Sequence, residues 1–169
     1  MNALSLEAQG VIDRLSNNTV GAGMILDREP NELIVEPGRR VSEARSDFVQ
    51  AHRSLITADE RTERAGHPPF TVWLTGLTGS GKSTVGYGLE RKLFDAGCRP
   101  AVLDGGNARL TYSKDLGFDA DERDENVRRT AEIARLVNES GGVAICAMLS
   151  PHRASRELAR DIIGAGRFI

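Results

Sequence analysis

Residues 70–169 alternate short apolar runs with longer amphipathic stretches. The runs Phe70–Leu74, Ala101–Leu103 and Val143–Leu149 are apolar without interruption, rather than alternating with polar residues. Continuous apolar runs are typical of strands that are buried on both faces, as in a parallel sheet. The pattern therefore predicts three short parallel strands.

The stretches between the runs have helical spacing. They predict helices over Lys82–Ala96, Asp121–Ser140 and Pro151–Ile163, and Asp119 with Glu122 predicts a capping pair before the second helix. The residues expected to face inward are Val85, Leu89 and Leu93 in the first helix, Val127, Ala131, Ala134 and Val137 in the second, and Leu158 and Ile162 in the third. The order β-α-β-α-β-α predicts an α/β doubly wound domain, a parallel sheet with flanking helices.

The last residues, Arg167–Ile169, resemble the start of a fourth strand. Three strands make a narrow sheet for this fold class, so we expect a sheet that is incomplete at the C-terminus.

Residues 1–69 are more polar and interrupted. Val11-Ile12, Asn17–Val20 and Gly23–Leu26 predict a hairpin with an Asn-rich turn. Ser42–Ile56 is interpreted as one polar helix, and the remainder of 27–69 as linker.

Composition excludes several classes of function. The 169 residues include 22 Lys and Arg against 24 Asp and Glu, a net charge of −2. This balance argues against bulk attraction to nucleic acid or an anionic membrane. No apolar run approaches the ~18 residues of a membrane span, and no signal peptide is visible. Two cysteines, Cys98 and Cys146, are too few for a disulfide framework or a zinc site, so a cytoplasmic location is expected.

The segment Gly76–Ser83 matches G-x-x-x-x-G-K-[ST] at every fixed position, between a predicted strand and a predicted helix. The glycines allow backbone N–H groups to surround a polyphosphate, and the helix N-terminus adds positive charge. Lys82 can reach the β- and γ-phosphates, and the Ser83 hydroxyl can ligate Mg²⁺. The motif predicts a P-loop NTPase-type sheet that binds a nucleoside triphosphate; the alternative is an accidental Gly/Ser-rich turn.

Two other residues follow predicted strands. Asp104 would lie beside the phosphate loop, where a carboxylate can hold Mg²⁺ or orient an attacking hydroxyl; the alternative is an Asp that merely ends a strand in a Gly-rich turn. Ser150 follows the third strand, and capping of the next helix, with Pro151 at its first position, is the favoured interpretation. No DxxG follows a later strand and no N-K-x-D occurs, which argues against a GTPase.

Four blocks in residues 70–169 resemble adenylylsulfate kinase (APS kinase), the family that phosphorylates the 3′-hydroxyl of adenosine 5′-phosphosulfate with ATP. They are G-L-T-G-S-G-K-S-T, L-D-G-G-N-A-R, D-L-G-F-D-A-D-E-R-D-E-N-V-R-R and L-S-P-H-R-A-S-R. The resemblance implies ATP as substrate, Mg²⁺ as cofactor, and the following site residues. ATP would be bound by Gly76, Leu77, Thr78, Gly79, Ser80, Gly81, Lys82, Ser83 and Thr84; adenylylsulfate by Arg109, Phe118, Arg123, Asn126 and Leu149; Mg²⁺ by Ser83 and Asp104; and catalysis would fall to Lys82, Asp104 and Ser150.

The implied roles suit the residue types. Arginine offers forked donors to phosphate and sulfate, and Phe118 offers a face for adenine. Without the resemblance, Arg123 would be interpreted as part of a solvated, charged helix face. Ser150 falls on the family's phosphoserine position, but in-line transfer requires positioning and charge neutralisation rather than a covalent relay.

The chain departs from the family in two places. The family has D-G-D-N where this chain has Gly106 in place of the second acid, and loss of a general base would lower the rate on the order of 10²–10⁴. The resemblance also covers roughly the first three-fifths of such a domain. We therefore expect a kinase domain without the further strand, helix and lid-like segment of the family.

Residues 11–25 resemble the closing segment of the GTPase-like large subunit of sulfate adenylyltransferase. The implied organisation is a β-barrel remnant over residues 1–26, a linker with a helix over 27–69, and the kinase-like domain over 70–169. It also implies a homodimer or association with sulfate adenylyltransferase subunits; the alternative is a chance hairpin.

The leading hypothesis is that the chain converts ATP and adenylylsulfate to ADP and 3′-phosphoadenylylsulfate. The alternatives are a nucleotide-binding or regulatory remnant without turnover, and another small-molecule phosphotransferase with the same loop.

Overall fold

The computed structural model describes residues 11–12, 19–21, 52 and 54–169, and it divides the chain into two units, Met1–Arg53 and Ser54–Ile169. In the first unit, β1 (Val11–Ile12) pairs antiparallel with β2 (Thr19–Gly21), with Val11 opposite Gly21. The predicted hairpin is confirmed for these strands, while its Asn-rich turn and residues 22–26 lie outside the described residues.

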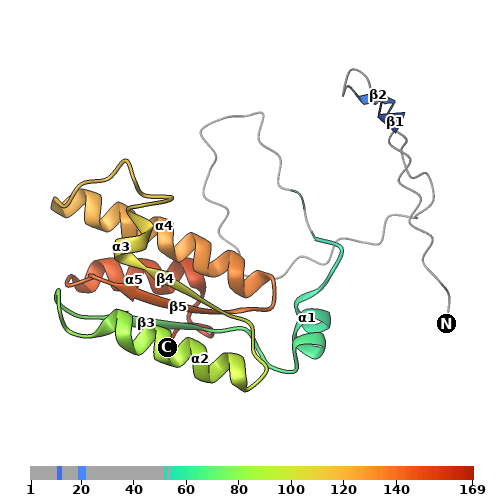
Figure 1. The fold of residues 1–169 in the computed structure, drawn as a ribbon, viewed down its shortest axis with the longest axis horizontal. Helices are drawn as coiled ribbons and strands as arrows, with labels where there is room; N and C mark the ends of the chain where they lie inside the picture. Colours follow the sequence, from blue (N-terminus) through green and yellow to red (C-terminus); the bar gives the residue numbers. More distant parts are fainter. Residues whose placement is uncertain (1–10, 13–18, 22–51, 53) are drawn as a thin grey trace. The chain divides into compact units, whose positions relative to one another are not determined.

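The second unit is a three-stranded parallel sheet with helices on both sides (Figure 1). The strands are β3 (Thr71–Thr75), β4 (Pro100–Asp104) and β5 (Val143–Met148), in the order β3-β5-β4. The helices are α1 (Ala58–Ala65), α2 (Lys82–Asp95), α3 (Gly105–Ala108), α4 (Ala120–Glu139) and α5 (Arg153–Ile163). The predicted α/β parallel architecture is confirmed.

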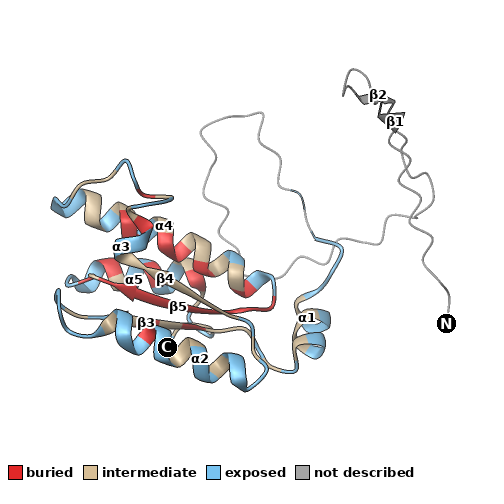
Figure 2. Ribbon diagram, viewed as in Figure 1, coloured by how far each residue is buried: buried red, intermediate tan, exposed pale blue. Residues whose placement is uncertain are grey.

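The central strand β5 carries the core. All six of its residues are buried (Figure 2). Alternate side chains point to opposite faces of a strand, so Ala144, Cys146 and Met148 pack with α4 and α5, whereas Ile145 and Ala147 face α2. The core of the first face also includes Trp73, Val127, Ala131, Ala134, Ala159 and Ile163.

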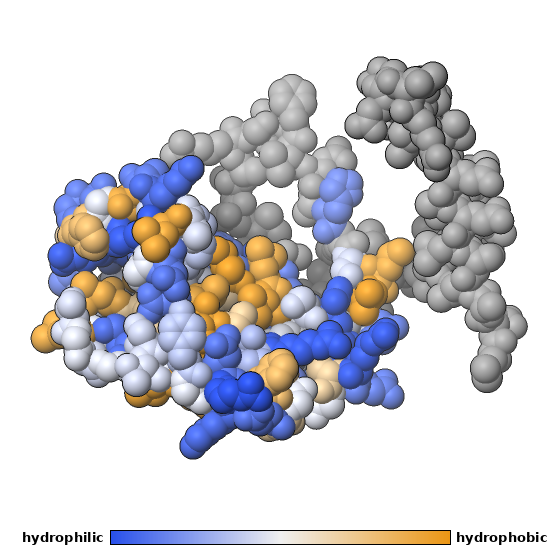
Figure 3. All heavy atoms as spheres, viewed as in Figure 1, coloured by the Kyte–Doolittle hydropathy of each residue, from blue (hydrophilic) through white to orange (hydrophobic). Residues whose placement is uncertain are grey.

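Helix α2 approaches the sheet through Gly86, its only buried residue, where a Cβ would lie 3.7 Å from both Leu74 and Ile145. The prediction that Val85 and Leu158 face inward is wrong, because Val85 is 57% exposed and Leu158 is 41% exposed. In α2 the small glycine faces the sheet instead of the larger valine. Figure 3 shows apolar side chains at the surface of this unit, and Val85 and Phe94 are among the exposed ones.

The helix boundaries agree with the sequence where local capping decides them. Asp119 and Glu122 form the predicted capping box of α4. The predicted helix over Ser42–Ile56 lies largely outside the described residues, and Ser54–Ile56 are not helical. Instead α1 begins after Thr57, which forms a capping box with Glu60.

The start of α5 differs from the prediction. The helix begins at Arg153 with His152 as its N-cap, rather than at Pro151 with Ser150 as its cap. The Ser150 side chain bonds β3 instead. Long-range packing therefore overrides the local capping preference.

The last residues extend along the outer edge of β3, as predicted. Phe168 bridges Thr71 in parallel, and the Trp73 N–H donates to the Ile169 carbonyl at 2.9 Å. The rings of Trp73 and Phe168 stack with their centroids 5.8 Å apart. Among the described residues, no helix is both long and apolar enough to cross a membrane.

Asn138, at the end of α4, fastens that helix to β3 and β5. It is 1% exposed, its Oδ1 accepts from the Thr71 hydroxyl at 2.8 Å, and its Nδ2 donates to the carbonyls of Phe70 and Gly142 at 2.9 and 3.2 Å. Replacement of this side chain leaves buried polar groups without partners.

We predict that Asn138→Ala lowers the free energy of unfolding by about 2–3 kcal/mol, measured by urea denaturation. Arg91→Ala, which removes an exposed ion pair with Asp95, is the control and should change it by less than about 0.5 kcal/mol. Equal effects of the two substitutions would contradict this account of Asn138.

Candidate active site

The loop between β3 and α2 has the backbone geometry that a phosphate-binding turn requires. Gly76 has φ of 152°, and a Cβ there would lie 2.7 Å from the Ser80 hydroxyl oxygen. Gly81, the N-cap of α2, has φ of 84° and no side chain to cap the helix. The first N–H groups of α2 therefore lack a capping side chain, which leaves them for an anion.

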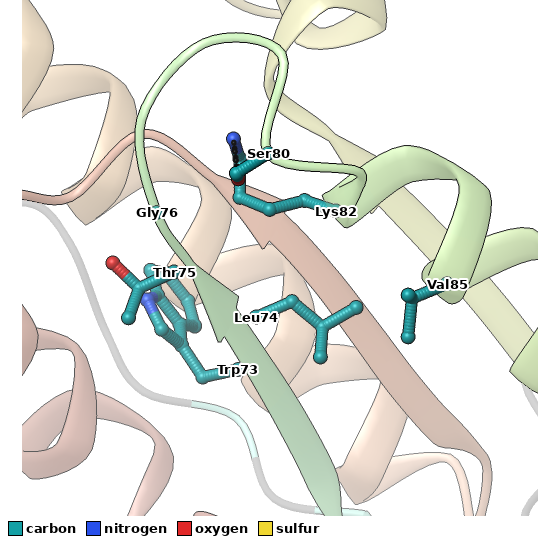
Figure 4. A pocket seen from close by; sticks show the side chains of 7 residues that line it. All are labelled: Trp73, Leu74, Thr75, Gly76, Ser80, Lys82 and Val85. Carbon is teal, nitrogen blue, oxygen red and sulfur yellow. Dashed lines mark hydrogen bonds between the residues drawn. The ribbon is translucent and has the colours of Figure 1, made fainter.

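Lys82 lies over this loop. Its ammonium donates to the Leu77 carbonyl at 2.8 Å and to the Ser80 hydroxyl at 3.3 Å. A cavity of about 330 Å³ adjoins it, lined by Trp73, Leu74, Thr75, Gly76, Ser80, Lys82 and Val85 (Figure 4). The side chain predicted to reach a triphosphate is thus held against the loop itself.

Asp104, at the end of β4, lies beside the loop as the strand-end argument predicts. Its carboxylate accepts from the Ser83 hydroxyl at 2.6 Å and from the N–H groups of Gly106 and Asn107 at 2.9 and 3.1 Å. Partial burial alone would raise the pKa of Asp104, but these hydrogen bonds outweigh it and lower the pKa below the ordinary value. The carboxylate is therefore ionised at neutral pH.

The turn after Asp104 is close to the Asp104 side chain at position 106. A Cβ at Gly106 would lie 3.1 Å from the Asp104 Oδ1 atom. The next side chain, Asn107, donates to the Tyr87 hydroxyl at 2.9 Å, which ties this turn to α2. Sequence reasoning missed Tyr87, because nothing in the pattern of α2 indicates a partner on another element.

Arg109 and Phe118 lie together. The Arg109 guanidinium is 4.3 Å from the centre of the Phe118 ring, and it donates to the carbonyls of Leu116 and Gly117. Phe118 is 68% exposed despite its size. An exposed aromatic ring held by an arginine is suited to stacking against a planar ligand.

The loop that carries Phe118 is fastened to α4 by Arg129. Its guanidinium bonds Asp115 at 2.6 Å, the Tyr112 carbonyl at 3.0 Å and Glu125 at 2.8 Å. Hydrogen bonding from Arg128, together with Arg129, holds the pKa of Glu125 at about 2, although burial opposes the shift. Sequence reasoning missed the bonds of Arg129 to Asp115 and Tyr112, which lie 14 and 17 residues away along the chain.

Arg123 and Asn126 lie one turn apart on α4. Asn126 is 4% exposed, and its Oδ1 and the Arg123 Nε are buried without a hydrogen-bond partner among the described residues. No hydrogen bond in this part of the chain joins either residue to Arg109 or Phe118. Buried polar atoms are normally paired, and among the described residues the Ser113 hydroxyl and His67 Nε2 share this unpartnered state.

Ser150 and Leu149 follow β5. Ser150 is fully buried, and its hydroxyl accepts from the Trp73 indole at 3.1 Å and donates to the Thr75 hydroxyl at 2.9 Å. Leu149 is half-buried. Sequence reasoning missed Trp73 and Thr75 as partners, because an apolar strand pattern gives no signal for a hydrogen bond across the sheet.

The oxygen donors of Ser83 and Asp104 fit a magnesium ion, which is typically held by one or two protein oxygens together with substrate phosphates. Among the described residues, no group of three or more His, Cys, Asp or Glu side chains forms a self-sufficient metal cluster.

The fold and the loop define a P-loop protein of the nucleotide-binding α/β class. The family model for adenylylsulphate kinase matches residues 68–169, and the chain belongs to that family.

Relatives and solved structures agree with this assignment. The chain is 41% identical to the bifunctional enzyme CysN/CysC of Rhodopirellula baltica, over 94% of this chain and 24% of that protein. It is 47% identical to the adenylyl-sulfate kinase of Erwinia tasmaniensis, over 70% of this chain and 59% of that protein. A structure of the Mycobacterium tuberculosis APS kinase CysC in complex with AMPPNP and APS is 43% identical with a TM-score of 0.55, over 56% of this chain and 55% of that one. The chain thus spans less than two-thirds of the length of these relatives.

We predict that Ser83→Ala raises the pKa of Asp104 toward the ordinary value. The Ser83 hydroxyl stabilises the ionised carboxylate, so its removal favours the protonated form. A pH titration of the Asp104 carboxyl carbon by NMR measures the shift. Ser80→Ala is the control, because the Ser80 hydroxyl bonds Lys82 and not Asp104; an unchanged pKa in Ser83→Ala would contradict the prediction.

Proposed function

We propose that the chain transfers the γ-phosphoryl group of ATP to the 3′-hydroxyl of adenosine 5′-phosphosulfate, giving ADP and 3′-phosphoadenylylsulfate. The observation that carries the proposal is the contact of Ser83 with Asp104 at the phosphate loop. The family match over residues 68–169 supplies the substrate class.

On the ATP side, the backbone N–H groups from Gly76 to Thr84 hold the phosphates. Lys82 exchanges its hydrogen bonds to Leu77 and Ser80 for bonds to phosphate oxygens, whose negative charge then pairs with the ammonium. Ser83 and Asp104 would hold Mg²⁺, which when bound neutralises charge on the polyphosphate. The structure of a relative with AMPPNP bound supports ATP as the substrate.

On the acceptor side, Arg109 and Phe118 hold the adenine, and Arg123 and Asn126 bind the phosphosulfate and sugar oxygens, with Leu149 beside them. The family match over residues 68–169 supports this assignment. Arginine suits the doubly charged phosphosulfate because its donors fit two oxygens at once.

The transfer itself rests mainly on positioning and charge. Asp104 is ionised and already accepts three hydrogen bonds, so it is a better metal ligand than proton acceptor. Gly106 provides no second carboxylate. In-line transfer in such a site depends on alignment of the acceptor hydroxyl and neutralisation of the phosphoryl oxygens.

The second candidate function is nucleotide binding without turnover. Gly106 favours it, because the family pattern places a carboxylate where this chain has none. A kinase that uses a different acceptor is a third outcome, to be separated by a substrate screen.

For the rest of the chain we propose a β-barrel remnant over residues 1–26 and a linker over 27–69. The bifunctional relative that aligns with 94% of the chain supports this organisation.

We also propose that the chain associates with itself or with sulfate adenylyltransferase subunits. A structural neighbour is described as a hexameric APS kinase from Thiobacillus denitrificans, 36% identical with a TM-score of 0.56. Two unpaired cysteines, Cys98 and Cys146, support a reducing, cytoplasmic location.

A coupled assay of ADP release tests the proposed reaction. We predict ADP formation that requires both adenylylsulfate and Mg²⁺, and a loss of about 100-fold or more in Lys82→Ala, which removes the charge beside the phosphates. Lys92→Ala, on the exposed end of α2, is the matched control and should retain activity. Binding of both ligands without ADP release would select the second candidate function.

We further predict that Gly106→Asp raises kcat by on the order of 10² if the absent carboxylate limits the reaction. The new Cβ must displace the Asp104 side chain by a few tenths of an ångström, so Gly106→Ala is the control for this steric effect. Steady-state rates of ADP release compare the variants, and equal rates for the two substitutions would show that the carboxylate is not the limiting group.

A further inference from the structure

A closed chain of hydrogen bonds joins the end of β3 to the turn after β5. The Trp73 indole N–H donates to the Ser150 hydroxyl at 3.1 Å, and that hydroxyl donates to Thr75 Oγ1 at 2.9 Å. The Thr75 hydroxyl in turn donates to the Ser150 carbonyl at 3.1 Å. We call these three residues the hydroxyl junction. Each hydroxyl donates its single proton, so the direction of every bond is fixed.

The turn on the far side of the junction is also held. The Arg156 guanidinium donates to the Ser150 and Pro151 carbonyls, each at 2.8 Å. The Ser150 carbonyl thus accepts from both Thr75 and Arg156, which uses its two lone pairs. Ser150 is 0% exposed and Trp73 is 7% exposed, so the bond between them is shielded from water, whereas Thr75 is exposed and its two bonds are partly buried.

The hydroxyl junction stands at the start of the phosphate loop. Thr75 is the last residue of β3, and Gly76 follows it with its positive φ. Figure 4 shows Thr75 with Trp73 on one side of β3 and Leu74 pointing the other way. Because Thr75 is bonded at its hydroxyl to the turn after β5, the position at which the loop leaves the sheet is fixed by a second strand.

We propose that Thr75 is a positioning residue for ATP, acting through the hydroxyl junction. This inference rests on the proposed ATP binding. Hydrogen bonds that polarise one another in a connected, partly buried chain hold geometry more tightly than separate bonds do. Phosphate-binding N–H groups must be held within a fraction of an ångström. Loss of the hydrogen bonds of Thr75, which directly precedes the loop, therefore weakens phosphate binding. The side-chain hydrogen bonds of Thr75 go to Ser150 and not to Arg123 or Asn126 on α4, so we expect adenylylsulfate binding by those two residues to be unaffected.

The test compares Thr75→Val, which keeps the shape and removes the hydroxyl, with Thr75→Ser, which keeps the hydroxyl. Calorimetric titration of the full chain with Mg²⁺ and AMPPNP gives the affinity for the ATP analogue, and titration with adenylylsulfate gives the affinity for the acceptor. We expect Thr75→Val to raise the Kd for AMPPNP about five- to tenfold, Thr75→Ser to restore it, and the Kd for adenylylsulfate to stay the same. Thr62→Val, on α1, is the matched control.

A second variant keeps the test decisive if Thr75→Val does not fold. Trp73→Phe removes the indole donor at the other end of the hydroxyl junction together with part of the ring that packs on Phe168, and we expect the same selective loss of AMPPNP affinity in folded protein. If folded Thr75→Val and Trp73→Phe bind AMPPNP with the wild-type affinity, the inference about Thr75 is overturned and the proposed function is not. Equal weakening of both ligands, without rescue by serine, would do the same, since it indicates general loss of structure.

A labelling measurement addresses the junction independently. The Ser150 hydroxyl is buried and donates to Thr75, so incubation with γ-labelled ATP should leave no phosphoserine at Ser150 by mass spectrometry. Phosphoserine there in folded protein would overturn the junction. A wild-type chain that does not bind AMPPNP would instead overturn the proposed function together with this inference.

Discussion

Parallel strands end at the same edge of a sheet, and this constraint brings the candidate groups of the site together. The phosphate loop follows β3, Asp104 ends β4, and Ser150 follows β5. Hydrogen bonds then connect the three strand ends: Ser83 with Asp104 on one side, and Thr75 with Ser150 on the other. Residues that lie up to 75 positions apart are thereby held within hydrogen-bonding distance.

At the same edge, the charged side chains of Lys82 and Asp104 are held by hydrogen bonds within the chain itself. Lys82 is bonded to the loop, and Asp104 is held ionised by the Ser83 hydroxyl and two backbone N–H groups. A site whose charges are already fixed requires little reorganisation during phosphoryl transfer. Gly106 stands beside this arrangement and supplies no second carboxylate, so the proposed binding does not depend on an acid at this position.

The sequence was sufficient for elements that local chemistry decides. Continuous apolar runs located β3 and β5, Asp119 and Glu122 located the start of α4, and the glycines of the loop predicted its backbone. It was insufficient where long-range packing decides. Ser150 has the sequence of a helix cap, but its hydroxyl bonds Trp73 and Thr75 across the sheet, and this bonding leaves His152 as the N-cap.

The roles of the site residues follow a similar division. Spacing alone indicated Lys82, Ser83 and Asp104, because a motif and a strand end specify them. Arg109, Phe118, Arg123 and Asn126 came from family resemblance, since nothing local distinguishes them from surface residues. The structure adds Tyr87, Arg129 and Arg156. Each has a hydrogen-bond partner outside its own helix, so the hydrophobic periodicity of that helix does not indicate it.

The central claim is that two nucleotides bind side by side at the carboxyl edge of the sheet. Chemical-shift mapping of the backbone amides by NMR tests it most directly, with Mg²⁺ and AMPPNP added first and adenylylsulfate second. The account predicts that the first ligand shifts the amides of Gly76–Thr84 and the second shifts those of Arg109, Phe118, Arg123 and Asn126. Saturating ligand that leaves both sets unmoved, or that shifts only residues of α1, would contradict it.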